Sequence, residues 1–198
     1  MRSGLVLLGL LAATAYIAGI YSDLGVWERI AKPAPALAMA AWVALHNGHR
    51  WIVIGLIFSA LGDLLLHLGD AYFLAGMGAF FLAHLSYIRA FRSKPGLSAL
   101  LFFALWGLVV YWLAWDQLGD FRAPVAAYIA IICLMMARAS ASGSVALTGA
   151  LLFGLSDTLI AIDRWIWDVP QSGLLIIATY WAGQALIARW GAIRPTTR

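Results

Sequence analysis

Two aspartates lie inside long apolar segments of the sequence, where a charged side chain is costly. Asp63 falls within Gly55–Leu66, and Asp157 falls within Gly149–Ile160. A carboxylate at the centre of a membrane helix costs about 2.5–3.5 kcal/mol, so such residues usually face the inside of a helix bundle. Two carboxyl groups in a shielded site suit general acid–base chemistry, because burial favours the neutral form of one while the other stays ionised. A polar network that only supports folding is the alternative.

The two aspartates occupy equivalent positions in similar segments. GLIFSALGDLLL and GALLFGLSDTLI align at an offset of 94 residues, which pairs Asp63 with Asp157. Membrane proteins often place a central site where two repeated halves meet. We therefore predict one membrane domain, residues 1–198, built as a parallel repeat of two four-helix halves, 1–94 and 95–198. Chance similarity between two apolar segments is the other interpretation.

Further polar side chains fall at similar depths in other apolar segments. At about 1.5 Å per residue, both aspartates lie about 12 Å below the outer edge of a core about 30 Å thick. His84 and Tyr87 share a helix face, as do Tyr180 and Gln184. These positions predict a polar cavity open toward the non-cytoplasmic side, although each residue also has a packing or interface role available. The candidate substrate-binding residues are Lys32, His84, Tyr87, Tyr128, Tyr180 and Gln184.

The elements that must position these residues are long apolar helices. Of the 198 residues, 64% are hydrophobic and 11% are charged, against about 45–50% and about 25% in soluble domains. This composition excludes a water-soluble globule, a disordered chain and a DNA-binding module. Basic residues are scattered, so no nucleic-acid partner is expected. The single cysteine, Cys133, excludes an internal disulfide framework and a zinc ribbon.

The sequence predicts an all-α polytopic membrane protein with eight transmembrane helices. A spanning helix needs about 20 mostly apolar residues, and turn or charge signals separate eight such segments. The first is expected to be a retained helix rather than a cleaved signal peptide, because its apolar run continues through Ile20. The predicted helices are Leu5–Ile20, Pro33–His46, Trp51–Leu66, Tyr72–Phe91, Leu97–Ala114, Arg122–Arg138, Val145–Ile162 and Ser172–Trp190.

Charges divide unevenly between the two predicted sides. By the positive-inside rule, the basic side faces the cytoplasm, so both termini are predicted to be cytoplasmic in a bacterial inner membrane. The cytoplasmic side carries Arg2, Arg50, Arg89, Arg92, Lys94, Arg138, Arg189, Arg194 and Arg198 and no acid. The opposite side carries Arg29, Lys32, Arg122 and Arg164, with Asp23, Glu28, Asp70, Asp116, Asp120, Asp163 and Asp168.

Several familiar chemistries have no motif in this chain. A GxSxG elbow, a P-loop and a dinucleotide fingerprint are missing, and Ser59 and Ser156 have no histidine at a suggestive spacing. No cofactor is expected. A metal site from Asp63, His67 and His84 is conceivable but lacks an HExxH motif or a dense histidine set. Besides an acid–base enzyme that uses the two aspartates, three other functions stay open. They are a metal-dependent intramembrane lipid hydrolase, a small-solute or proton-coupled transporter, and a lipid-binding scaffold.

Six pieces of the chain match, in order, the motifs of a known family. They are Lys32-Pro33, FSALGDLLL at Phe58–Leu66, GMGAFFLAHLSYI at Gly76–Ile88, AYIAII at Ala127–Ile132, GALLFGLSDTLIA at Gly149–Ala161 and TYWAGQALIA at Thr179–Ala188. On these motifs the chain resembles the YhhN family of eight-helix membrane proteins, whose animal members are lysoplasmalogenases. The two aspartate motifs are the most specific part of the resemblance.

The resemblance implies hydrolysis of the vinyl ether bond of a lysoplasmalogen, a lysophospholipid that meets the enzyme among the membrane lipids. The products would be a fatty aldehyde and a glycerophospho-head-group compound. It also implies that Asp63 and Asp157 are the catalytic residues, and that the six candidate substrate-binding residues named above line the pocket around them. Because a vinyl ether hydrolyses once its β-carbon is protonated, one aspartate is expected to donate the proton. The other is expected to stabilise the cation and activate water, as paired carboxyls do in glycosidases.

Overall fold

The computed structural model describes residues 2–21 and 30–194, and within these ranges the chain is all-α. A helix forms at each of the eight predicted segments, so the predicted fold class is confirmed in its all-α part. The helices are α1 (Arg2–Tyr21), α3 (Ala34–Leu45), α4 (Arg50–His67), α5 (Phe73–Ala90), α6 (Leu97–Ala114), α7 (Arg122–Ser140), α8 (Ser144–Trp165) and α9 (Ser172–Ala192). Short 3-10 turns lie at η1 (Asp70–Tyr72), η2 (Trp115–Gln117) and η3 (Gly119–Phe121).

At three of the breaks between helices, one residue takes a positive φ, which a right-handed helix does not allow. Asn47 has φ 52°, Gly69 has φ 107° and Gly143 has φ 110°. Each lies at a predicted break. Positive φ is easy for glycine and tolerated by asparagine, which explains why these residue types mark the breaks.

Five of the helical segments are long and apolar enough to cross a membrane, and the chain is an integral membrane protein. A 12-residue helix such as α3 is about 18 Å long, shorter than a hydrocarbon core of about 30 Å. Eight complete spans, the parallel repeat and cytoplasmic termini therefore stay predictions. Of the loop charges behind the predicted sidedness, Asp23, Glu28, Arg29 and Arg198 lie outside the described residues. The five segments are Arg50–His67, Asp70–Ala90, Leu97–Gln117, Gly119–Ser140 and Ser144–Trp165.

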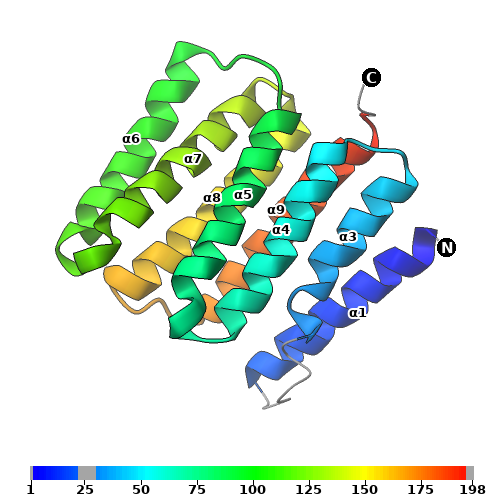
Figure 1. The fold of residues 1–198 in the computed structure, drawn as a ribbon, viewed down its shortest axis with the longest axis horizontal. Coiled ribbons are helices and arrows are strands. Elements are labelled where there is room, and N and C mark those ends of the chain that lie inside the picture. The colour runs from blue at the N-terminus through cyan, green and yellow to red at the C-terminus, as the bar shows by residue number, and fades with distance from the viewer. Residues whose placement is uncertain (1, 22–29, 195–198) are drawn as a thin grey trace. The chain divides into compact units, whose positions relative to one another are not determined.

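The chain forms two compact units, which we call unit 1 (Met1–Ala90 with Ile187–Arg198) and unit 2 (Phe91–Leu186). In unit 1, α1 packs against α3, α3 against α4, and α4 against α5 (Figure 1). In unit 2, α6, α7 and α8 all contact one another. The helix α9 contributes its first residues to unit 2 and its last residues to unit 1.

Helix α4 buries a stripe of small and polar residues and exposes several large apolar residues. Gly55, Ser59 and Asp63 are buried at intervals of four residues, whereas Ile57 and Leu61 are exposed. A soluble protein has the opposite pattern. Lipid accommodates the exposed apolar side chains, and small residues let neighbouring helices approach closely. This pattern places the acid of α4 inside unit 1.

Helix α9 makes close backbone contacts at two glycines, Gly183 near its middle and Gly191 near its end. In unit 2, a Cβ on Gly183 would lie 2.8 Å from the carbonyl oxygen of Gly149 and from the amide nitrogen of Phe153 in α8. In unit 1, the Gly191 carbonyl accepts a hydrogen bond from the amide of His49, at 2.9 Å. Backbone-to-backbone contact of this kind fixes the register of α9 on its neighbours.

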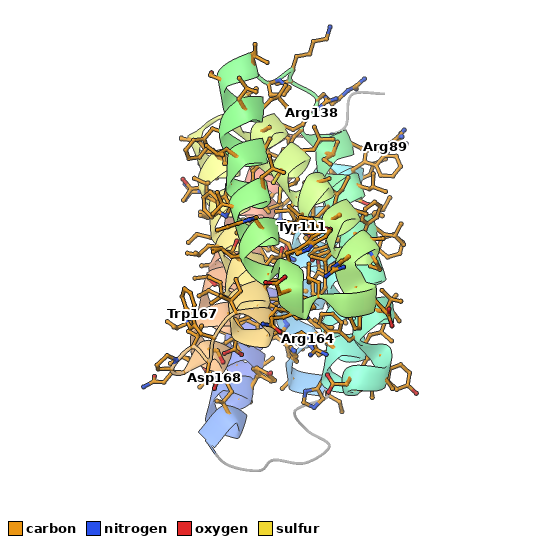
Figure 2. All side chains as sticks on the ribbon, turned by 90° about the vertical axis from the view of Figure 1, so that its left-hand side faces the viewer. Arg89, Tyr111, Arg138, Arg164, Trp167 and Asp168 are labelled. Carbon is orange, nitrogen blue, oxygen red and sulfur yellow. The ribbon has the colours of Figure 1, made fainter. Side chains whose placement is uncertain are left out.

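Charged and interfacial residues mark the two ends of unit 2. Arg138 lies at one end of the helices, and Trp167 and Asp168 lie at the other (Figure 2). The guanidinium of Arg138 donates to the carbonyl of Arg92, at 3.4 Å, next to the α5–α6 connection. Both ends therefore carry groups that favour an aqueous or head-group environment, with apolar helix between them.

Candidate functional site

Asp63 is almost fully buried in unit 1, with 2% of its surface exposed. The antiparallel packing of α4 and α5 produces this burial. A Cβ on Gly62 would lie 2.6 Å from the ring of Phe80, and one on Gly76 would lie 2.7 Å from Leu66. Glycines on both helices therefore bring α5 close to α4 and enclose the face that carries the aspartate.

A buried polar group from α5 meets this same face. Ser59 and Tyr87 share a hydrogen bond between their hydroxyl oxygens, at 3.2 Å. The Tyr87 ring also lies against Gly55, where no side chain would fit. His84 is fully buried one turn away, with its ring centre 6.5 Å from that of Tyr87. Tyr87 thus points to α4, and His84 is buried beside it on α5.

Lys32 approaches Asp63 from the turn that precedes α3. Burial lowers the pKa of the Lys32 ammonium, while the nearby Asp63 carboxylate acts in the opposite direction and raises it. The ammonium also lies 5.9 Å from the ring centre of Tyr16, whose ring is 6.4 Å from that of His67. Unit 1 therefore brings together Lys32, Asp63 and a small aromatic cluster.

Asp157 is partly buried in unit 2 and has a tyrosine partner. The hydroxyl of Tyr128 in α7 donates a hydrogen bond to Asp157 Oδ1 in α8, at 3.3 Å. Both residues were expected in the site from the sequence, and this bond shows that they are neighbours. A hydrogen bond to a carboxylate fixes its orientation.

The residues on either side of Asp157 bond to two other helices. Ser156 Oγ donates to the carbonyl of Ile176 in α9, at 3.0 Å. Thr158 Oγ1 accepts a hydrogen bond from the indole of Trp106 in α6, at 3.2 Å, and donates to the carbonyl of Gly154, at 2.7 Å. Three consecutive side chains therefore connect α8 to α9, α7 and α6.

Tyr180 and Gln184 are both buried in α9, as their shared face predicts. Tyr180 packs edge-on against Phe153 of α8, with ring centres 5.2 Å apart. The bond from Ser156 to Ile176 sets the register of these antiparallel helices. In this register Gln184 lies nine residues beyond the level of Asp157, or ~13 Å along the bundle. Within unit 2, Tyr128 rather than Gln184 is the direct neighbour of the acid.

The structure adds Ser59 and Tyr16 to the residues around Asp63. Ser59 precedes Asp63 by one helical turn, so the four-residue spacing was a usable signal. The sequence alone marks Ser59 only as a possible nucleophile, a role that needs a histidine partner. Tyr16 gave no such signal, because tyrosine is common in apolar membrane helices and its contact with Lys32 joins two distant parts of the sequence.

The metal site weighed from the sequence is not formed. Across residues 2–21 and 30–194, no three His, Cys, Asp or Glu side chains are grouped so that they could hold a metal ion. The trio of Asp63, His67 and His84 is included in that finding. The two acids instead have lysine, serine and tyrosine side chains around them.

Comparisons with known proteins find relatives that match most of the chain. The chain is 42% identical to bovine lysoplasmalogenase TMEM86A over 157 residues, 72% of this chain and 65% of that protein. It is 39% identical to human lysoplasmalogenase TMEM86B over 175 residues, 83% of this chain and 75% of that protein. A Mycobacterium tuberculosis lysoplasmalogenase is 29% identical over 184 residues, 77% of this chain and 70% of that protein.

The chain spans about two thirds of the length of the bovine relative, at 65%. No solved structure matches it. The family model described as the YhhN family matches residues 27–190, which include both aspartates and every predicted pocket residue. The chain therefore belongs to the YhhN family.

Proposed function

We propose that this protein is a membrane lysoplasmalogenase that hydrolyses the vinyl ether bond of a single-chain lipid. The observation that carries the proposal is the similarity to relatives named lysoplasmalogenase, 42% and 39% identical, together with a family match over residues 27–190 that includes both aspartates. The surroundings of these acids support it. Each acid lies among hydrogen-bonding groups inside an apolar protein, which is how general acids and bases are held for proton transfer.

The reaction needs a proton donor, a counter-charge and a water molecule. A carboxylic acid protonates the β-carbon of the vinyl ether, and an oxocarbenium ion forms at the carbon bonded to oxygen. Water adds to that carbon and loses a proton to a carboxylate, which gives a hemiacetal. The hemiacetal then breaks its bond to the glycerol oxygen and yields an aldehyde and an alcohol. Every proton that is taken up is returned, so the reaction consumes only water.

Asp63 and Asp157 are proposed to supply the acid and the carboxylate. A negative charge held near a developing oxocarbenium ion lowers the barrier, as in glycosidases. In this proposal Tyr128 orients Asp157 through their 3.3 Å hydrogen bond. Lys32, which is partly exposed beside Asp63, suits the phosphate of the head group.

The proposed setting is a bacterial inner membrane with both termini in the cytoplasm and the cavity open to the opposite side. The proposal includes the two-half repeat, in which each half contributes one acid. A lipid with one chain suits such a site, because its tail can remain among apolar helices while its head group stays in the interface.

Product analysis in heavy water tests the proposal directly. Purified protein is incubated in D₂O with a lysoplasmalogen, and with matched lysolipids that carry an alkyl ether or an ester. We expect aldehyde only from the vinyl ether, with one deuterium on the carbon next to the carbonyl, because that carbon receives the proton from the acid. Release of a fatty acid from the ester, or aldehyde without deuterium, would contradict the mechanism.

Tyr128→Phe is expected to lower kcat on the order of tenfold with little change in KM. The substitution removes the hydrogen bond that orients Asp157, and bonds to charged groups contribute about 1.5–3 kcal/mol. Initial rates over a range of substrate concentrations separate the two constants. Tyr72→Phe is the matched control, because Tyr72 is exposed on η1. Equal kcat values for Tyr128→Phe and the parent protein would remove Tyr128 from the mechanism.

A further inference from the structure

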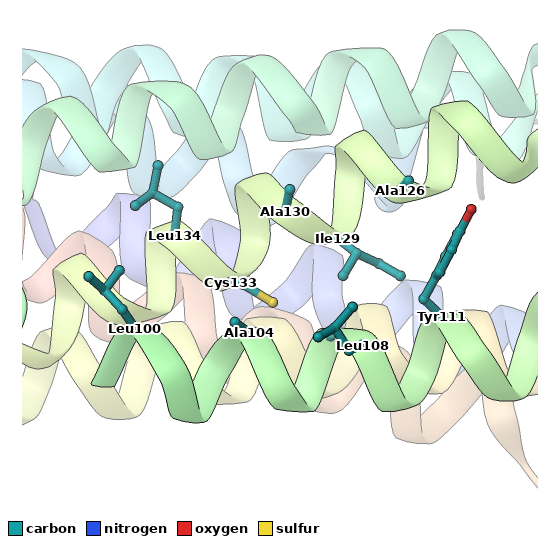
Figure 3. A pocket seen from close by; sticks show the side chains of 10 residues that line it. Leu100, Ala104, Leu108, Tyr111, Ala126, Ile129, Ala130, Cys133 and Leu134 are labelled. Carbon is teal, nitrogen blue, oxygen red and sulfur yellow. The ribbon is translucent and has the colours of Figure 1, made fainter. Parts of the chain in front are cut away.

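An apolar groove runs between α6 and α7 in unit 2 and has a volume of about 440 Å³. Leucines line both sides, including Leu100 and Leu108 of α6 and Leu134 of α7 (Figure 3). Tyr111 stands at one end, and Cys133 points its sulfur between the two helices. Helix α6 is also largely exposed, with Phe103, Gly107 and Ala114 as its buried residues. The groove therefore opens on an exposed, apolar face of unit 2.

Small residues on both helices shape this groove. A Cβ on Gly107 would lie 2.5 Å from Ile129 Cγ2 and 2.6 Å from Cys133 Sγ, so the two helices are in close contact there. Ala104 of α6 and Ala130 of α7 also line the groove. The short side chains of Ala104 and Ala130 leave a channel along the helix pair, with larger side chains as its walls.

The length of the groove matches one layer of a bilayer. Leu100 and Tyr111 are eleven residues apart on α6, which is about 16 Å along the helix. The hydrocarbon core is about 30 Å thick, so the groove extends over about half of it. An extended acyl chain has this length and this apolar character.

Polar and charged residues surround the end of the groove at Tyr111. The Tyr111 hydroxyl donates to the carbonyl of Arg122, at 3.3 Å. The Arg122 Nε donates to the carbonyl of Trp115, at 3.3 Å, and its guanidinium lies 4.2 Å from the Trp115 ring centre. Exposed Asp116 and Asp120 belong to the same loop. A fixed cation, two acids and interfacial aromatics thus stand where a lipid head group would lie.

We propose that this groove binds one acyl chain of a zwitterionic glycerophospholipid. The head-group phosphate bonds to Arg122, where the N-terminal end of α7 also favours negative charge. The head-group ammonium faces Asp116 and Asp120. The loop carries both signs of charge, as a zwitterionic head group does. This lipid site stands independently of the reaction proposed above.

Photo-crosslinking tests the acyl-chain part of the proposal. The probe is a phosphatidylethanolamine with a diazirine at the end of one acyl chain, added to the protein in non-ionic detergent micelles. We expect labelled peptides from around Leu100 and Leu134, the end of the groove away from Tyr111. Ala130→Leu fills the groove and should lower this labelling about tenfold. Ala127→Leu makes the same change at an exposed position of α7 that does not line the groove, and should leave labelling unchanged.

Competition tests the head-group part. Unlabelled phosphatidylethanolamine should displace the probe. Diacylglycerol with the same chains should reach the same displacement only at about tenfold higher concentration. Arg122→Gln should remove that difference. If Ala130→Leu fails to fold, Ala104→Leu fills the groove from α6. Equal labelling along all exposed faces of α6 would overturn the proposal. So would self-association of the chain that protects the peptides around Leu100 and Leu134 from the probe.

Discussion

Asp63→Asn and Asp157→Asn should each lower vinyl ether cleavage by about 10²–10⁴-fold, the usual contribution of a general acid or base. Asparagine has nearly the same shape as aspartate but neither gives up a proton as an acid nor carries a negative charge. The rate of aldehyde release from a lysoplasmalogen measures the loss. Asp70→Asn and Asp168→Asn change exposed loop aspartates in the same way and should keep the parent rate.

The double variant shows whether the two acids act in one step. If they act as a unit, the double variant should be no slower than the slower single variant, because removing one member already disables the pair. Far-UV circular dichroism and thermal unfolding in detergent identify any variant that has lost its fold. Cleavage near the parent rate in both folded single variants would exclude the aspartates as catalysts.

Gly183→Ala should lower the free energy of unfolding by about 2 kcal/mol or more, within the range for overpacked cores. The new Cβ would lie 2.8 Å from the Gly149 carbonyl oxygen and from the Phe153 amide nitrogen. These are backbone atoms of α8, so no side-chain rotation relieves the contact and the two helices must separate. Thermal or denaturant unfolding in detergent measures the change.

Gly173→Ala is the matched control for this prediction. Gly173 lies on the same helix, and a Cβ there would have no heavy atom within 4 Å. Because alanine favours helix by up to ~1 kcal/mol over glycine, this variant should be as stable as the parent or slightly more stable. Equal unfolding midpoints for the two variants would show that α8 and α9 are not held together by close backbone contact at Gly183.

The helices were predictable from sequence, because two strong local signals define them. Long apolar runs give the segments, and asparagine or glycine at the breaks permits the positive φ observed at Asn47, Gly69 and Gly143. Helix ends were less predictable. The prediction ended one helix at Ile162, before Asp163 and Arg164, but α8 continues to Trp165. Charged residues end the apolar run of the sequence, but the helical backbone hydrogen bonds of α8 continue through them.

The partners of the site residues were less predictable than the residues themselves. The polar side chains stood out because each is costly in an apolar segment. The bonds between Ser59 and Tyr87, and between Trp106 and Thr158, depend on how each helix is rotated about its axis. That rotation follows from close packing at glycines such as Gly55 and Gly154. Packing of this kind involves residues far apart in the chain, so the local pattern does not reveal it.

The three side-chain bonds made by Ser156, Asp157 and Thr158 limit how unit 2 can move. A turn of α8 by one residue, about 100°, would break all of them together, and so would a slide along its axis. These bonds consequently fix the rotation of α8 about its axis, and so the direction in which the Asp157 carboxyl group points relative to three neighbouring helices. A movement that lets a long lipid tail reach Asp157 can therefore take one of two forms. Either α8 moves together with its neighbours as a rigid body, or only side chains change rotamer.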